Sequence, residues 1–300
     1  TWGGNGTVSQ ALRPFPQYGY INTDSYLQNV GQSTYEALEA KLEHRFSSGL
    51  NLLASYTFSK TLTDADSIQP FYSTLQNQGG TQNPYDHKAE KAVSNEDVPN
   101  NFVVSYLYDL PVGRGKHFLH NAPRAVDAVI GNWRISGVQR YLSGQPISFF
   151  GAAGIPGFDN GIRPDRVPGT NPVRVHGHYN PFSFSDAGGE AQACTTGYWN
   201  CGAFADPNVN RGTGPFRFGT MPRNSADIRG FAFADEDFGI NKTIPIHESM
   251  SLEFRGEMFN AFNRHVFNKP DSGLYDVNFG QIGSTLNGPR NVQFVLKLHY

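Results

Sequence analysis

The sequence predicts an all-β fold, in the form of an antiparallel transmembrane β-barrel segment of about seven strands. The final stretch, residues 291–300, is the clearest evidence, because apolar and polar side chains alternate along it and successive strand side chains point to opposite faces. Roughly ten residues are enough for a tilted strand to cross a bilayer core. The stretch ends on an aromatic ring, which suits a membrane interface. Its apolar face carries Val292, Phe294, Leu296, Leu298 and Tyr300.

The composition agrees with this fold class. The 300 residues include 33 Gly, 23 Phe and 14 Tyr, which is typical of a chain with many turns and aromatic-rich strands. A mean hydropathy of −0.46 is compatible with a barrel, because barrel strands are apolar only at alternate positions and barrel loops are polar. No apolar run is long enough for a membrane helix. The formal net charge of −2 predicts no nucleic-acid partner.

The connections between the predicted strands alternate in length. A barrel with brief periplasmic turns and extended extracellular loops has this arrangement, and its last strand would end at the periplasmic rim. A soluble β sandwich has no reason to collect every long loop at one end. In chain order the connections are short, long, moderate, very long, short and long, over residues 47–49, 61–100, 111–132, 144–234, 245–249 and 261–290.

The first elements are a loop over residues 1–34 and a hairpin over residues 35–60. The loop is rich in Gly, Asn and Pro and has no period. In the hairpin, residues 35–46 have types that favour a helix, but the turn and the clear strand that follow favour a strand. As a strand, this segment turns a row of alternating charges inward, which suits a wet lumen. These inward residues are Glu39, Lys41, Glu43 and Arg45.

The second hairpin is expected over residues 101–143. Its long turn includes a stretch from Ala122 to Ile130 that is compatible with a short amphipathic helix. An external loop over residues 61–100 precedes this hairpin. A second, irregular external loop over residues 144–234, rich in Gly, Pro and Asn, follows it.

The third hairpin is expected over residues 235–260, where residues 238–244 and 250–260 alternate. A loop over residues 261–290 then leads to the closing strand, 291–300. The acidic run Asp235-Glu236-Asp237 lacks the spacing of a calcium loop, and a solvated loop face is the simpler interpretation. In the last strand of the hairpin the residues Glu253, Arg255 and Glu257 face inward.

The predicted outward faces carry almost no charge. His44 and Lys242 are the exceptions, and both lie close to a predicted periplasmic turn. A Lys or Arg at the bilayer midplane would cost roughly 2–4 kcal/mol, whereas a charge near the interface costs little. The alternative is a soluble secreted β protein that binds carbohydrate through aromatic loops. That alternative requires the apolar faces to be buried against a second layer of the same molecule.

Motifs that carry chemistry are few. Cys194 and Cys201 enclose six residues, and in an exported protein such a pair is expected to form a disulfide. A metal site is not predicted, because the two imidazoles of His176 and His178 in a loop are weak evidence for one. Neither Gly-x-Ser-x-Gly nor His-Glu-x-x-His occurs. The sequence therefore predicts no catalytic residues, no enzymatic activity and no cofactor.

Several stretches together resemble a known family. They are Leu12-Arg-Pro-Phe-Pro16, Leu53-Ala-Ser-Tyr-Thr-Phe-Ser-Lys60, Ala92-Val-Ser-Asn95, Leu110-Pro-Val-Gly-Arg-Gly-Lys116, Phe254-Arg-Gly-Glu-Met-Phe-Asn-Ala-Phe-Asn263 and the terminal strand. From about residue 12 to residue 300 the chain resembles the barrel end of TonB-dependent receptors, most closely the Oar-like group with a carboxypeptidase-regulatory-like domain. The resemblance implies an outer-membrane transporter that takes up a siderophore, an oligosaccharide or a similar ligand.

The resemblance also implies parts that this sequence does not show. Family members have a signal peptide, a regulatory-like domain, an N-terminal plug with the TonB box ahead of it, and a 22-stranded barrel. Energy coupling to TonB would act through that plug. Seven antiparallel strands do not close by themselves, because single-chain bacterial barrels are even-numbered and start at eight. The sequence is therefore expected to be a C-terminal fragment, about the last third of the barrel. A small autonomous barrel, serving as a pore or an adhesin, is the remaining alternative and needs an eighth strand.

Two further sets of residues take a role from this resemblance. In the family the barrel-assembly machinery recognises the terminal aromatic strand, which here corresponds to Phe294, Leu296, Leu298 and Tyr300. Ligand contacts are expected from loop aromatics, although packing of the loops on themselves is the simpler interpretation for each ring. The loop aromatics considered are Phe71, Tyr72, Tyr85, Tyr179, Phe182, Tyr198 and Trp199, of which Tyr72, Tyr85, Tyr198 and Trp199 are the candidate ligand contacts.

Overall fold

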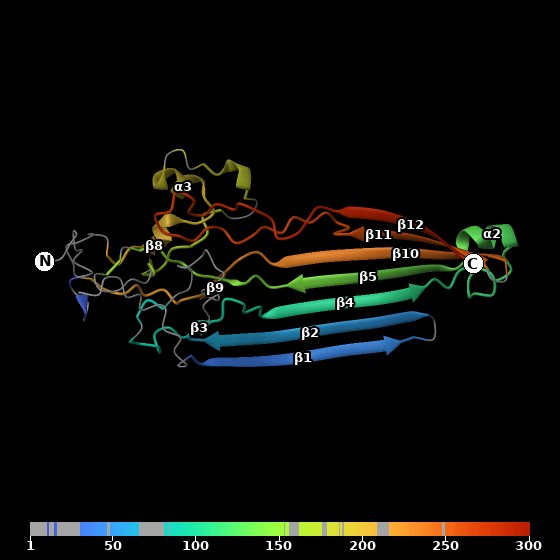
Figure 1. Cartoon of the computed structure of the whole chain (residues 1–300), viewed down its shortest axis with the longest axis horizontal. Coiled ribbons are helices and arrows are strands. Elements are labelled where there is room, and N and C mark those ends of the chain that lie inside the picture. Colours follow the sequence, from blue (N-terminus) through green and yellow to red (C-terminus); the bar gives the residue numbers. More distant parts are fainter. Residues whose placement is uncertain are drawn as a thin grey trace.

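Seven long strands form one antiparallel sheet in the order β1-β2-β4-β5-β10-β11-β12 (Figure 1). The computed structural model describes residues 11, 15–16, 31–46, 49–65, 81–83, 85–152, 154–155, 162–175, 179–185, 187, 189–208, 216–247 and 250–300. The strands are β1 (Ser33–Arg45), β2 (Leu50–Thr63), β4 (Asn100–Asp109), β5 (Trp133–Leu142), β10 (Phe233–His247), β11 (Met250–Phe259) and β12 (Asn291–His299). The predicted all-β fold class and the strand interpretation of residues 35–46 are confirmed.

The register brings the apolar positions of all seven strands onto one face of the sheet, called here the apolar face. Leu38 lies opposite Phe58 between β1 and β2, and Phe254 lies opposite Leu296 between β11 and β12. Large side chains on this face are exposed, with 66% of Leu38 and 67% of Leu296 accessible. They are not buried against a second layer of the described chain. This is the arrangement expected of a surface that contacts lipid.

The opposite face of the sheet, the polar face, is concave. A hollow of about 720 Å³ is lined by residues of β1, β2, β4, β5, β10 and β11, most of which belong to the polar face. Glu43, Arg45, Ser105, Asp237 and Glu257 are among them. The sheet therefore bends toward its polar side, as a barrel wall bends toward its lumen.

All short connections lie at one end of the sheet, the turn end, and all long connections lie at the other, the loop end (Figure 1). At the turn end, β1 and β2 are joined through Gly49, whose φ of +88° favours glycine. The connection between β4 and β5 holds the helix α2 (Arg124–Ile130), within the stretch where the sequence suggested a short helix. None of the described helices has the length and apolarity needed to cross a bilayer.

The three long connections fold together into a compact unit at the loop end, called here the cap. It comprises the described residues of 64–99, 143–232 and 260–290. The predicted irregular external loop, 144–234, is in fact structured, because short strands and helices order it. These are β6 (Pro146–Ile147), β7 (Asp165–Arg166), η3 (Pro181–Ser183), α3 (Glu190–Thr196), η4 (Cys201–Ala203), β8 (Phe204–Ala205) and β9 (Ser225–Arg229). The first connection adds β3 (Ala92–Val93), which pairs with the end of β2.

The hydrophobic core of the described chain lies in the cap. None of the buried apolar side chains belongs to the seven long strands. The ring of Phe149 packs against those of Trp199 and Phe204, at centroid distances of 5.1 and 4.3 Å. Phe279 joins them from the third connection. The core residues are Ile147, Phe149, Ala193, Trp199, Ala203, Phe204, Met221, Ile228 and Phe279.

The strand β10 begins five residues earlier than the sequence pattern suggested. The predicted solvated loop face at Asp235-Glu236-Asp237 is wrong, because these residues pair with β5. Glu236 lies opposite Gln139, on the apolar face, and is only 1% exposed. Arg264 neutralises it, with Nε 2.7 Å from the carboxylate. An acidic run can thus enter a strand because another connection supplies the counter-charge.

Candidate functional site

The candidate functional site consists of two parts, the polar face of the sheet and the cap that continues from its strands. On the polar face, Glu253 of β11 is the centre of a network across three strands. Its carboxylate accepts hydrogen bonds from Asn241 of β10 and, at 2.9 Å, from Arg255. Its Oε2 lies 3.0 Å from Nε2 of His299 in β12. These contacts fix the polar face of the last three strands.

The structure places all seven residues predicted to face inward on the polar face. Glu39 lies opposite Thr57 and Lys41 opposite Ser55, away from the apolar side chains. Lys41 and Glu43 form an exposed ion pair at 3.1 Å. Glu257 accepts a hydrogen bond from Gln293 of the neighbouring strand. The residues thus pair mainly with each other and with neighbouring strands, while remaining accessible from the concave side.

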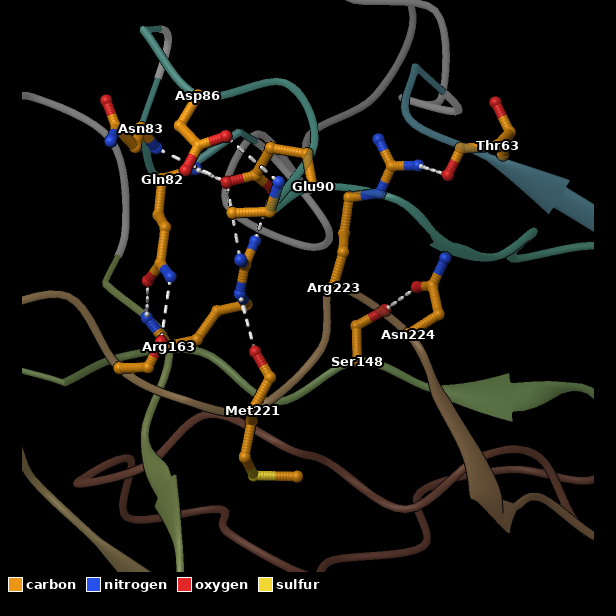
Figure 2. Close-up of polar contacts among 12 residues, drawn as sticks. Thr63, Gln82, Asn83, Asp86, Glu90, Ser148, Arg163, Met221, Arg223 and Asn224 are labelled. Carbon is orange, nitrogen blue, oxygen red and sulfur yellow. Dashed lines mark hydrogen bonds and ion pairs between the residues drawn. The ribbon is translucent and has the colours of Figure 1, made fainter. Parts of the chain in front are cut away.

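In the cap, a buried ion pair joins the first and second connections. Glu90 and Arg163 meet at 2.6 Å, and their side chains are 0% and 4% exposed. Figure 2 shows how the remaining hydrogen-bonding capacity is used. Arg163 Nε donates to the carbonyl of Met221 at 3.0 Å, and Glu90 also accepts from the backbone amides of Gln82 and Asn83. A buried pair is stabilising only when its geometry and hydrogen bonds are this complete.

A second set of contacts ties the cap to the end of the sheet. Arg223 donates to the carbonyl of Thr63, the last residue of β2, at 2.7 Å (Figure 2). Arg229 pairs with Asp97 at 2.7 Å, and Asp97 also accepts from the backbone amide of Thr61 in β2 at 2.7 Å. Asn224 donates to the carbonyl of Val93 at 2.8 Å. The cap is therefore attached to the end of the sheet by hydrogen bonds of charged and amide side chains, in addition to the covalent connections of the chain.

The candidate ligand aromatics separate into different environments. Trp199 is 1% exposed, its ring lies in the cap core and its Nε1 donates to the carbonyl of Asp271 at 2.7 Å. The expectation that Trp199 contacts a ligand is wrong, because the core encloses it. Tyr198 packs edge-on against Tyr179 at 5.5 Å, so it too belongs to the packing of the cap. Burial raises the pKa of Tyr198 above its ordinary value.

Other aromatic residues of the cap are at its surface. Tyr85 is 83% exposed and Phe182 is 97% exposed. These two rings are accessible to a ligand, and neither lines the hollow of the polar face. Phe71 and Tyr72 lie outside the described residues, as do His176 and His178. Within the described part of the chain, no group of three or more His, Cys, Asp or Glu residues is arranged to hold a metal ion.

The cap contains one disulfide among its described residues, between Cys194 at the end of α3 and Cys201 at the start of η4. Their Cα atoms are 5.4 Å apart. The loop that the bond closes includes Trp199 of the core and Asn200, whose side chain accepts a hydrogen bond from the amide of Gly202 at 3.1 Å. The bond therefore holds the segment that delivers Trp199 to the core.

The electrostatics of the cap surface are clearest at Asp165. The guanidinium of Arg217 hydrogen-bonds this carboxylate, and Thr220 donates to it from its backbone amide and its hydroxyl, each at 2.9 Å. The Arg217 hydrogen bond is the largest reason why the pKa of Asp165 lies below its ordinary value. Beside this group, a hollow of about 310 Å³ is lined by Arg166, Thr170 and Asp227, among others. It is an open, mixed-charge surface and not an enclosed binding pocket.

No local pattern of the sequence indicates the ion pairs that hold the cap together. Glu90 and Arg163 are separated by 73 positions, and Asp97 and Arg229 by 132. No local period connects such pairs. A compositional hint exists only for Arg163 and Arg229, which are charged residues in stretches rich in Gly and Pro.

An antiparallel sheet that exposes an apolar face, has a concave polar face and carries its short turns at one end defines an outer-membrane β-barrel protein. The model of the family described as outer membrane beta barrel domain matches residues 1–293. The chain belongs to this family and is located in the bacterial outer membrane. Its short turns are therefore periplasmic and its cap is extracellular. No curated protein and no solved structure matches the chain.

Proposed function

We propose that this chain forms part of the barrel of a TonB-dependent outer-membrane receptor, which imports a siderophore, an oligosaccharide or a similar ligand. The observation that carries the proposal is the cap. Three extracellular connections fold into one packed unit with its own core, beside a concave polar face. Such a unit offers a fixed ligand-recognising surface at the external end of a polar path. In this proposal the chain is not an enzyme and requires no cofactor.

The strand order favours a large barrel. Among the described strands, β1 pairs only with β2 and β12 only with β11, so both are edges of the sheet. With seven antiparallel strands, β1 and β12 run in the same direction and would have to pair in parallel to close. Lipid does not tolerate unpaired strand edges, and bacterial barrels are closed by antiparallel, even-numbered strands. Further strands between β12 and β1 satisfy both requirements.

The proposed partners follow from this assignment. Lipid contacts the apolar face, and an unknown ligand contacts the cap and the polar face. TonB acts through the N-terminal plug that receptors of this kind carry. The barrel-assembly machinery recognises β12 and the terminal ring through Phe294, Leu296, Leu298 and Tyr300. These side chains are exposed, Tyr300 by 97%, so they are accessible for such recognition before insertion.

Transport by the intact gene product in its own bacterium tests the proposal. We would measure accumulation of a panel of radiolabelled ferric siderophores and oligosaccharides in the parent strain, in a strain lacking this gene and in a strain lacking TonB. The proposal expects at least one compound whose uptake requires the gene, TonB and the proton-motive force. Loss of uptake in the first deletion but not in the second would overturn energy coupling.

A small autonomous barrel is the second candidate, because membership of the barrel family is equally compatible with it. Planar-bilayer recordings on the purified gene product distinguish the two. A steady open conductance that needs no TonB supports a pore, whereas a closed barrel in the same recordings supports the receptor.

A further inference from the structure

The connection between β4 and β5 at the turn end is a folded knob, defined here as residues 110–132. Asp127 of α2 accepts a hydrogen bond from the amide of Arg114 at 2.6 Å, and the amide of Gly113 donates to the carbonyl of Phe118 at 2.9 Å. The backbone at Gly131 lies so close to the side chain of Asp127 that an added Cβ would be 2.4 Å from Asp127 Oδ1. The knob therefore has a fixed shape.

The knob packs against the apolar face of the sheet. Trp133 and Lys242 face each other across β5 and β10 on this face. Trp133 Nε1 donates to the carbonyl of Val129 at 2.9 Å, and Lys242 Nζ donates to the carbonyl of Gly131. The C-terminal end of α2 is thus held on the lipid-facing side. These contacts also explain the charge at Lys242, which is 5% exposed, with its ammonium 5.1 Å from the centre of the Trp133 ring.

The outer surface of the knob combines apolar and cationic side chains. Phe118, Leu119, Val126 and Val129 are 56%, 60%, 44% and 67% exposed. Its cations are exposed too, whereas Asp127, the one acid in this stretch, is engaged with the amide of Arg114. Exposed apolar groups mixed with cations are typical of segments that lie in a membrane interface and meet anionic headgroups. The basic residues of the knob are Arg114, Lys116, His117, His120 and Arg124.

We propose that the knob is a membrane foot, which lies in the headgroup layer of the periplasmic leaflet and binds anionic phospholipid. Its position supports this occupant, because the knob continues the lipid-facing surface of the sheet at its periplasmic end. The apolar side chains enter the acyl boundary, and the cations contact the headgroup phosphates. The inference rests on the outer-membrane location and not on the proposed transport, so failure of either leaves the other standing.

The first test measures where the knob lies. Cys194 and Cys201 are joined to each other, so a cysteine introduced by Val129→Cys can be labelled with an environment-sensitive fluorophore. Phe182→Cys, on the cap, is the matched control because that side chain is 97% exposed. The gene product is reconstituted into phosphatidylcholine vesicles with or without phosphatidylglycerol. We expect headgroup-nitroxide lipids to quench the label at 129 but not at 182. If aqueous iodide quenches both labels equally, the proposal is overturned.

The second test measures the headgroup preference. Arg114→Gln with Lys116→Gln removes two cations of the knob, and Lys88→Gln with Lys91→Gln removes two exposed cations of the cap. Phosphatidylglycerol retained by the purified protein is counted by native mass spectrometry. We expect the knob variant to bind about fivefold more weakly for each cation removed, and the cap variant to bind like the parent protein. Heat-modifiable electrophoresis checks that both variants are folded. Equal retention by the two variants overturns the headgroup assignment.

Discussion

The sheet and the cap are built on opposite principles, although one continuous chain forms both. The seven long strands contain no buried apolar side chain, and the apolar side chains of β12 are exposed. The cap collects a cluster of rings and aliphatic side chains, with a buried ion pair beside it. The sheet therefore depends on its hydrogen-bond ladder and on lipid, whereas the cap is folded like a small water-soluble domain.

This difference separates the part of the chain that inserts into lipid from the part that faces water. Lipid supplies the apolar environment for the outward side chains of the strands. The backbone groups within the bilayer must be paired by the hydrogen bonds between strands. The cap faces water and has to bury its own apolar surface. Substitutions should therefore act on one part without acting on the other, and four experiments test this separation.

The largest effect is expected from Arg163→Met. This variant leaves Glu90 as a charge buried without its partner, which costs roughly 3–5 kcal/mol. Hydrogen exchange of the detergent-solubilised protein should show loss of protection in the cap and unchanged protection in the strands. Arg166→Met is the control, because its pair with Asp227 is 3.5 Å long and exposed, and such pairs contribute at most about 1 kcal/mol. If strands and cap lose protection together, the two regions are one cooperative unit.

The next effect is expected from charge placed on the apolar face. Leu296→Arg introduces a charge near the middle of β12, at a cost of roughly 2–4 kcal/mol if the position lies at the bilayer midplane. Gln293 of the same strand is on the polar face and lies opposite Glu257, so Gln293→Arg should be tolerated. Urea titrations of folding into vesicles compare the two variants. Equal loss in both would show that β12 does not distinguish lipid from lumen.

Removal of the disulfide should affect the cap alone. The closed loop is short, and constraint of the unfolded chain predicts a loss of about 2.5 kcal/mol in the double variant Cys194→Ser/Cys201→Ser. Limited proteolysis should then cleave the segment around Trp199 faster, while the barrel keeps its heat-modifiable mobility. The parent protein treated with reductant serves as a second route to the same state. Unchanged proteolysis in both would mean that the core alone holds this segment.

The smallest effect is expected from pH at Asp165. Its pKa lies below the ordinary value because of the Arg217 hydrogen bond. The ionised carboxylate therefore stabilises the cap above the unfolded pKa of about 3.9, and this contribution is lost as the pH falls through the folded pKa. Cap protection in hydrogen exchange should decrease more between pH 6 and pH 3 in the parent protein than in Asp165→Asn. Identical decreases would show that this carboxylate contributes nothing measurable.

The strands were predictable from sequence because their signal is local. Lipid on one side and polar groups on the other impose a period of two, which can be read without knowledge of partners. Residues 35–46 have types that favour a helix, but most of them form β1, because the neighbouring strand β2 provides the backbone hydrogen-bond partners. The start of β10 was not predicted, because the residues that neutralise its charges are distant in the sequence. Its acidic run resembles a loop until Arg140 and Arg264 are known to lie nearby.

The cap was not predictable because its contacts are long-range and follow no period. For Trp199, packing of the loop on itself was the simpler interpretation, but no sequence period identifies its partner Phe149, which lies fifty positions earlier. The pairing of Glu90 with Arg163 depends on two different connections, one between β2 and β4 and one between β5 and β10. Only the disulfide was accessible in advance, because both cysteines lie within one short stretch.

The cap draws its partners from three separate connections, which limits how such proteins can diversify. A recombination event that exchanges one extracellular connection delivers Glu90 without Arg163, or Phe279 without Phe149. The resulting hybrid has a buried charge without its counter-ion, or a cavity in the core, where the parent protein has an ion pair or a packed ring. Changes of the cap surface should therefore arise through joint inheritance of all three connections, or at exposed positions such as Tyr85 that leave the shared interior intact.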